Sequence, residues 1–84
     1  MDDVKANVSD FILKEFLPGE NPKNLTDSTP LITSGVLDSL ATLRMVAHLE
    51  ETYGIQFEAH EMDASNLNTI CDIANLVQTK LQAR

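Results

Sequence analysis

Apolar side chains recur at helical spacing in three stretches of the chain. The first stretch predicts a helix over residues 3–17, because its apolar positions fall on one face. Asp2 and Asp3 stand at its start, where the helix dipole favours acids, and Pro18 with Gly19 ends it. The apolar face consists of Val4, Val8, Phe11, Ile12 and Phe16.

The second stretch predicts a helix over residues 39–52. Asp38 can cap its start, since a carboxylate accepts the free N–H groups of the first turn, and Gly54 can end it. The expected apolar face consists of Leu40, Leu43, Val46, Ala47, Leu49 and Tyr53.

The third stretch predicts a last helix near the C-terminus. Asn66 or Asn68 can cap it, and Thr69 with Asp72 has the form of a capping box. Residues 58–64 favour one or two helical turns before it. The apolar positions of this last helix are Ile70, Ile73, Ala74, Val77 and Leu81.

Residues 18–37 contain all three prolines of the chain and predict a long loop. Leu25, Leu31 and Ile32 are expected to attach this loop to the core, and residues 27–30 to begin a short helical turn. The pattern as a whole predicts an all-α bundle with three main helices, one short helix and a long first loop. No repeat or boundary divides it, so we expect a single domain over residues 1–84.

The charge is negative and unevenly placed. The 84 residues contain 6 Lys and Arg against 13 Asp and Glu, a net charge of −7. Residues 24–79 hold eight of these acids and a single base, Arg44. This balance argues against nucleic acid or an anionic membrane as a partner. It predicts either a solvated acidic surface or one that attracts basic partners.

The sequence shows neither a membrane-spanning run nor a signal peptide, and it has a single cysteine, Cys71. We therefore expect a monomer in a reducing cytoplasm, without membrane insertion. His48, His60 and Cys71 do not form a metal-ligand pattern, so no metal site is expected. Ser39 lacks the flanking glycines of a nucleophile elbow. We expect no catalytic activity.

Ser39 is the one residue whose position suggests chemistry. It opens the second predicted helix, directly after Asp38 and a glycine-containing turn. A hydroxyl there lies beside free N–H groups and the positive end of the helix dipole, which favours a phosphate ester. The alternative from position alone is that Ser39 is an ordinary helix-start residue.

Two segments resemble acyl and peptidyl carrier proteins. Residues 31–40, L-I-T-S-G-V-L-D-S-L, resemble the attachment segment of that family, with its G-x-x-D-S-L core at positions 35–40. Residues 49–55, L-E-E-T-Y-G-I, resemble the end of the family's second helix. Together with the length, the acidity and the long first loop, the resemblance covers essentially the whole chain.

The resemblance implies a four-helix bundle of the acyl-carrier type, with a groove between helices two and three. A phosphopantetheinyl transferase is then expected to attach 4′-phosphopantetheine from coenzyme A to Ser39, with Asp38 beside the attachment point. The arm's thiol holds an acyl or aminoacyl group as a thioester. An acyl- or aminoacyl-loading ligase and downstream acyl-processing enzymes are the implied partners.

The resemblance also makes the second helix the surface that partners recognise. Its exposed candidates are Leu40, Ala41, Arg44, Ala47, His48 and Glu51. Carriers of fatty-acid synthesis usually have acids where this chain has Ala41 and Arg44. That departure favours a specialised, stand-alone carrier in lipid or secondary-metabolite biosynthesis over the housekeeping fatty-acid carrier.

Two alternatives remain at this stage. One is an aminoacyl or D-alanyl carrier loaded by an adenylate-forming ligase. The other is a small acidic helical adaptor that binds a basic protein and carries no prosthetic group.

Overall fold

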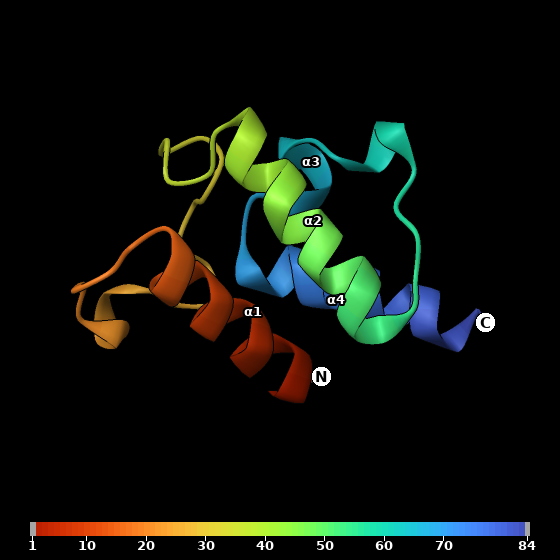
Figure 1. The fold of residues 1–84 in the computed structure, drawn as a ribbon, viewed down its shortest axis with the longest axis horizontal. Coiled ribbons are helices and arrows are strands. Elements are labelled where there is room, and N and C mark those ends of the chain that lie inside the picture. The colour runs from red at the N-terminus through yellow and green to blue at the C-terminus, as the bar shows by residue number, and fades with distance from the viewer. Residues whose placement is uncertain (1, 84) are drawn as a thin grey trace.

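A computed structural model describes residues 2–83, and within this range the fold is all-α. Four α-helices and two short 3-10 turns, η1 and η2, follow one another along the chain (Figure 1). The predicted fold class is therefore confirmed. The elements are α1 (Asp2–Glu15), η1 (Pro22–Asn24), α2 (Ser39–Tyr53), η2 (Ala59–Glu61), α3 (Ala64–Leu67) and α4 (Ile70–Gln82).

Helix α1 packs against α4 through the predicted apolar face. Val4, Val8 and Ile12 are buried, and Phe11 and Phe16 pack partly buried beside them. The helix ends two residues before the predicted position, because the amides of both Phe16 and Leu17 bond to the carbonyl of Ile12 and close the last turn.

Helix α2 begins and ends as its capping residues predict. Oδ1 of Asp38 accepts a hydrogen bond from the amide of Ala41 at 2.8 Å. Gly54 adopts a left-handed conformation, with φ of 66°, and its amide bonds to the carbonyl of Glu50. Glycine adopts this conformation without the steric cost that a Cβ imposes.

The buried face of α2 differs from the predicted one. The residues that face the core are Ala41, Thr42, Met45, Val46 and Leu49. Leu40 and Leu43 are instead 69% and 52% exposed, and Ala47 is exposed as well. Ala41, expected on the surface, is buried. Val46 and Leu49 are buried as the periodicity predicts, and Leu40 and Ala47 are exposed as the resemblance implies. The periodicity was wrong for Leu40, Leu43 and Ala47, because apolar residues lie on almost every side of this helix and select no unique face.

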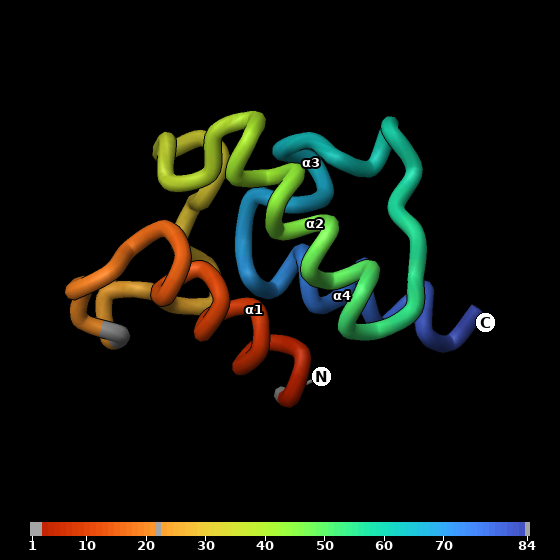
Figure 2. Tube along the Cα trace, in the orientation of Figure 1, coloured from red at the N-terminus to blue at the C-terminus, as the bar shows by residue number. Residues whose placement is uncertain are grey.

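The long loop between α1 and α2 is attached to the core by buried side chains. Leu25 and Leu31 are buried and Ile32 is partly buried, as predicted. The short helical turn predicted at residues 27–30 is not found there. The helical turn η1 lies earlier in the loop, and residues 26–29 form only a hydrogen-bonded turn. Figure 2 shows this loop and the second long connection, residues 54–63, flanking α2 on opposite sides.

The predicted helical turns at residues 58–64 correspond to η2 and the start of α3. Asp63 caps α3, since its Oδ1 accepts a hydrogen bond from the amide of Ser65. Thr69 caps α4 through the amide of Asp72, as the capping-box pattern predicts. Neither Asn66 nor Asn68 caps α4, and that alternative was wrong.

Candidate functional site

Ser39 is the first residue of α2, and its side chain is exposed. Its hydroxyl makes no hydrogen bond to any other residue in the range 2–83 that the structure describes. An exposed hydroxyl without a hydrogen-bond partner at a helix N-terminus is accessible to a modifying enzyme. The free amides beside it favour a phosphate group.

Asp38 fixes the backbone immediately before Ser39. Its carboxylate caps the amide of Ala41, and its carbonyl oxygen accepts hydrogen bonds from the amide and the hydroxyl of Thr42. Thr42 is buried, so this second anchor is protected from water. The two anchors hold the start of α2, and with it Ser39, on a rigid support.

The loop that leads into Ser39 is held by Asn68, at the C-terminal end of α3. Oδ1 of Asn68 accepts hydrogen bonds from the amides of Ile32 and Thr33 at 2.9 and 3.0 Å. Its carbonyl oxygen accepts a third from the amide of Leu31 at 2.6 Å. The sequence suggested Asn68 only as a helix cap, because nothing in its local context indicates a partner 36 residues away.

Gly35 allows the loop to turn back toward α2. Its φ is +88°, a conformation that side chains with a Cβ adopt only with strain. Its amide bonds to the carbonyl of Ile32, and the hydroxyl of Ser34 bonds to the carbonyl of Pro30. These bonds close the turn three residues before Asp38.

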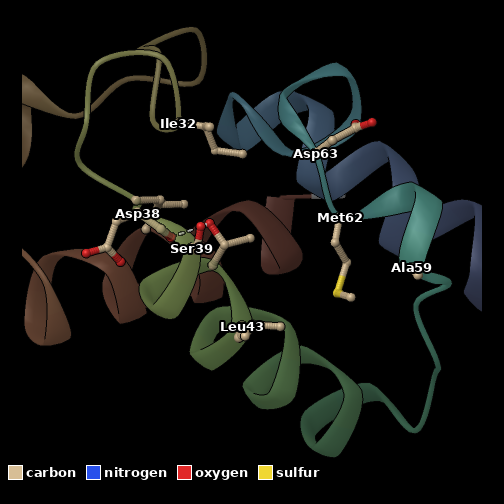
Figure 3. Close-up of a pocket in the computed structure, with 9 residues that line it drawn as sticks. Ile32, Asp38, Ser39, Leu43, Ala59, Met62 and Asp63 are labelled. Carbon is tan, nitrogen blue, oxygen red and sulfur yellow. Dashed lines mark hydrogen bonds between the residues drawn. The ribbon is translucent and has the colours of Figure 1, made fainter.

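An open pocket of about 520 Å³ lies beside Ser39. Its lining includes apolar side chains from three parts of the chain: Ile32 from the loop, Leu43 from α2 and Met62 after η2. Figure 3 shows Leu43 and Met62 pointing into the same space, with Ser39 at its edge. The volume falls within the range of small-ligand sites. Asp38 and Asp63 are the charged groups in the lining.

These residues fit a phosphopantetheine group. The exposed hydroxyl would supply an attachment atom, the helix N-terminus favours a phosphate, and the adjoining pocket is apolar enough for an acyl chain. The pocket also joins α2 to the segment before α3, where the resemblance places a groove.

Four of the predicted interface residues lie along one exposed face of α2. Leu40, Arg44, Ala47 and Glu51 are all exposed and recur at intervals of three or four residues. Leu40 stands next to Ser39 and is the more exposed of the two exposed large apolar side chains described on this helix. This face of α2 therefore continues directly from Ser39.

Arg44 and His48 also contact α1. The Nη2 atom of Arg44 lies 3.0 Å from Oε1 of Glu15, and the guanidinium lies 5.9 Å from the centre of the Phe16 ring. The His48 ring stacks on Phe11 with 4.2 Å between centroids. These contacts hold both side chains in place, so α1 shapes the surface that α2 presents.

The remaining sequence predictions concern a metal site, the residues His60 and Cys71, and membrane-spanning helices. Among residues 2–83, no three His, Cys, Asp or Glu side chains gather in a way that could hold a metal ion. His60 is exposed and Cys71 is partly buried in α4. Within the same range, no helix has the length and apolar character needed to cross a membrane.

Comparison with known proteins agrees with this geometry. The family model described as "Phosphopantetheine attachment site" matches residues 12–77. "D-alanyl carrier protein 2" of Lactiplantibacillus plantarum is 33% identical over 69 residues, which is 82% of each chain. "Acyl carrier protein" of Chlamydia muridarum is 32% identical over 79 residues, which is 94% of this chain and 92% of that protein.

A solved structure is also similar. A chain in the structure titled "Crystal structure of FAD-dependent dehydrogenase" superposes with a TM-score of 0.75 at 30% identity. The match covers 83% of this chain and 97% of that one.

The fold, the site and these matches define a carrier protein. The chain belongs to the phosphopantetheine attachment family, which includes acyl and D-alanyl carriers. The expected family and its phosphopantetheine cofactor are thereby confirmed. A carrier domain of this kind interacts with a phosphopantetheinyl transferase and with loading ligases, and such domains are generally non-catalytic.

Proposed function

We propose that Ser39 carries the 4′-phosphopantetheine group and that residues 1–84 form one carrier domain. The observation that carries this assignment is the exposed, unbonded Ser39 hydroxyl at the start of α2, beside the apolar pocket. In the reaction, the Ser39 oxygen attacks the phosphorus on the pantetheine side of the pyrophosphate linkage of coenzyme A and loses its proton. The new phosphodiester forms as that linkage breaks, and adenosine 3′,5′-bisphosphate leaves. The bound group supplies a terminal thiol that holds the cargo as a thioester.

The rest of the site supports this role without taking part in the chemistry. Asp38 and Thr42 keep the first turn of α2 fixed, so the attachment atom stays at a constant place. Asn68 fixes the loop before it. We assign the domain no catalytic activity of its own: it presents cargo, and its partner enzymes react with that cargo.

The partners in this proposal contact the exposed face of α2. Leu40 and Ala47 supply apolar contacts beside the arm, while Arg44, His48 and Glu51 supply polar ones. Arg44 is fixed by Glu15, so an enzyme that docks here meets a positive charge on an otherwise acidic protein. Such a feature excludes enzymes whose docking patch is basic. This supports a specialised, stand-alone carrier over the housekeeping fatty-acid carrier.

The cargo is an acyl or an aminoacyl group. The relatives include one protein of each kind, a D-alanyl carrier and an acyl carrier, at nearly equal identity. The apolar lining of the pocket favours an acyl cargo, and the D-alanyl or other aminoacyl cargo is the second candidate. The prosthetic-group-free adaptor is set aside, because the chain belongs to a phosphopantetheine attachment family.

The attachment is tested by intact mass after incubation with coenzyme A and a broad-specificity phosphopantetheinyl transferase. The wild type and Ser34→Ala should each gain one phosphopantetheine, and Ser39→Ala should gain none. Ser34 is a matched control because its hydroxyl, also exposed and in the same segment, is engaged by the carbonyl of Pro30. Modification of a folded Ser39→Ala protein would contradict the assignment.

A further inference from the structure

One wall of the pocket beside Ser39 has little helical structure of its own. Residues 54–63 connect α2 to α3, and Ala59, Met62 and Asp63 of this segment line the pocket. Its helical part is the 3-residue turn η2, and Ile55 is its buried anchor. Because few backbone hydrogen bonds fix this segment, side-chain contacts determine where the wall stands.

Lys80 of α4 contacts this wall at two places. Its Nζ lies 2.7 Å from Oε1 of Glu61, the last residue of η2, and both side chains are only 18% exposed. The same ammonium group lies 5.4 Å from the centre of the Phe57 ring, just before η2. One side chain of α4 therefore contacts the segment before its helical turn and at the last residue of that turn.

The carboxylate that Lys80 binds also organises the turn itself. Oε1 of Glu61 accepts a hydrogen bond from the amide of Glu58 at 2.7 Å, which caps η2. The hydrogen bond from Lys80 is the main reason why the pKa of Glu61 lies below its usual value. The next residue is Met62, whose side chain shares the pocket with Leu43 (Figure 3).

We propose that Lys80 is a positioning residue for the cargo pocket. By holding Phe57 and Glu61, it keeps Met62 opposite Leu43 and so determines how well the pocket shields an apolar acyl chain from water. This inference rests on the proposed function, in which the cargo is a thioester on an arm attached to Ser39. A short cargo such as acetyl has too little apolar surface to gain from the pocket.

The effect of Lys80 on this wall is measured first in the protein without phosphopantetheine, by amide hydrogen exchange at Glu61 and Met62. Their amides bond to the carbonyls of Glu58 and Ala59, so exchange reports opening of the wall. Lys80→Gln should accelerate it about fivefold. Lys80→Arg keeps the charge and should restore slow exchange. Lys5→Gln, which removes the ion pair with Asp27 elsewhere, should leave these two amides unchanged.

The cargo effect is tested by loading the same variants from hexanoyl- and acetyl-coenzyme A with the transferase. Hydrolysis is then followed: water attacks the thioester carbon and releases the carboxylic acid and the free thiol. In Lys80→Gln the hexanoyl thioester should hydrolyse about fivefold faster than in the wild type, and the acetyl thioester at the wild-type rate. Lys80→Arg should behave as the wild type.

Unchanged exchange at Met62 in Lys80→Gln, or an equal acceleration of both thioesters, would overturn the role of Lys80. Failure of the folded wild type to be loaded at Ser39 would instead overturn the proposed function. The exchange experiment needs no arm, so the two failures are distinguishable.

Discussion

Asn68 accepts a hydrogen bond from the backbone amide of Ile32 at 2.9 Å, across 36 residues of sequence. The same oxygen accepts a second bond from the amide of Thr33. In the loop before Ser39, this side chain therefore supplies the hydrogen-bond acceptor that a backbone carbonyl supplies in a helix or strand. The rigidity of the loop before Ser39 depends on a residue of the opposite half of the chain.

Replacing Asn68 should destabilise the protein through this loop. Asn68→Ala leaves two amides without an acceptor, and we expect the free energy of unfolding to fall by about 1–3 kcal/mol. Asn68→Asp keeps an acceptor oxygen and should retain most of the stability. Urea unfolding of the three proteins measures the difference. An aspartate variant as unstable as the alanine variant would show that the acceptor is not what matters.

The sequence predicts well those features that depend on neighbouring residues. Asp38, Gly54 and Thr69 were recognised because helix caps follow from local backbone chemistry. The place of Ser39 at the start of α2 was predicted in the same way, and its role as the attachment residue remains a prediction. The bounds of helix α1 were predicted to within two residues, because Val4, Val8 and Ile12 recur along one buried face.

The features that the sequence did not reveal depend on contacts between distant segments. The bonds of Asn68 to the loop and of Lys80 to Glu61 join parts of the chain with no shared pattern. The apolar periodicity of α2 predicted Val46 and Leu49 correctly but also placed Leu40 and Leu43 on the buried face, because these two are as apolar as the residues that are buried. Their exposure follows from which side of α2 meets the shared core, and periodicity does not encode that.

The cap at Asp38 should contribute measurably to the stability of α2. Asp38→Ala removes the acceptor for the Ala41 amide, and we expect a loss of about 1 kcal/mol. Asn and Ser at position 38 can still cap the helix, so the free energy of unfolding of Asp38→Asn and Asp38→Ser should stay within about 0.3 kcal/mol of the wild-type value. Thermal and urea unfolding decide this. An equal loss in all three variants would assign the effect to the charge rather than to the cap.

Arg44 and Glu15 should be energetically coupled. Their ion pair is largely exposed, so a double-mutant cycle with Arg44→Gln and Glu15→Gln should give a coupling of about 0.2–1 kcal/mol that decreases with salt. Arg44→Glu should destabilise more than Arg44→Gln, because it places a second carboxylate beside Glu15. Reversing both charges, Arg44→Glu with Glu15→Arg, should recover part of the loss. A coupling of zero would mean that Arg44 is free to reorient toward a partner.

The uneven charge should make stability depend on salt. Residues 24–79 hold eight acids and one base, and only two of these acids, Asp27 and Glu61, form ion pairs with described bases. Screening the remaining repulsion should raise the melting temperature between low and high salt. Glu51→Gln removes one exposed, unpaired acid and should reduce the rise. A melting temperature independent of salt would contradict self-repulsion.

Glu61 should make the wall of the pocket sensitive to acid. Its pKa lies below the usual value of 4.5, first because of the hydrogen bond from Lys80 and next because of the amide of Glu58. A carboxyl group whose pKa is lower in the folded state than in the unfolded chain adds stability above the unfolded pKa. That stability is lost as the pH falls through the folded value.

The lowered pKa of Glu61 gives the direction of the expected change in stability with pH. Wild type should be more stable than Glu61→Gln at neutral pH, and the difference should shrink as the pH falls below about 4.5. Urea unfolding of both proteins across this pH range measures it. In a Lys80→Gln background the pH-dependent part should be much smaller, because the main cause of the lowered pKa is gone. A difference that stays constant with pH, or that survives unchanged in this background, would show that the ion pair with Lys80 does not hold Glu61 in its charged form.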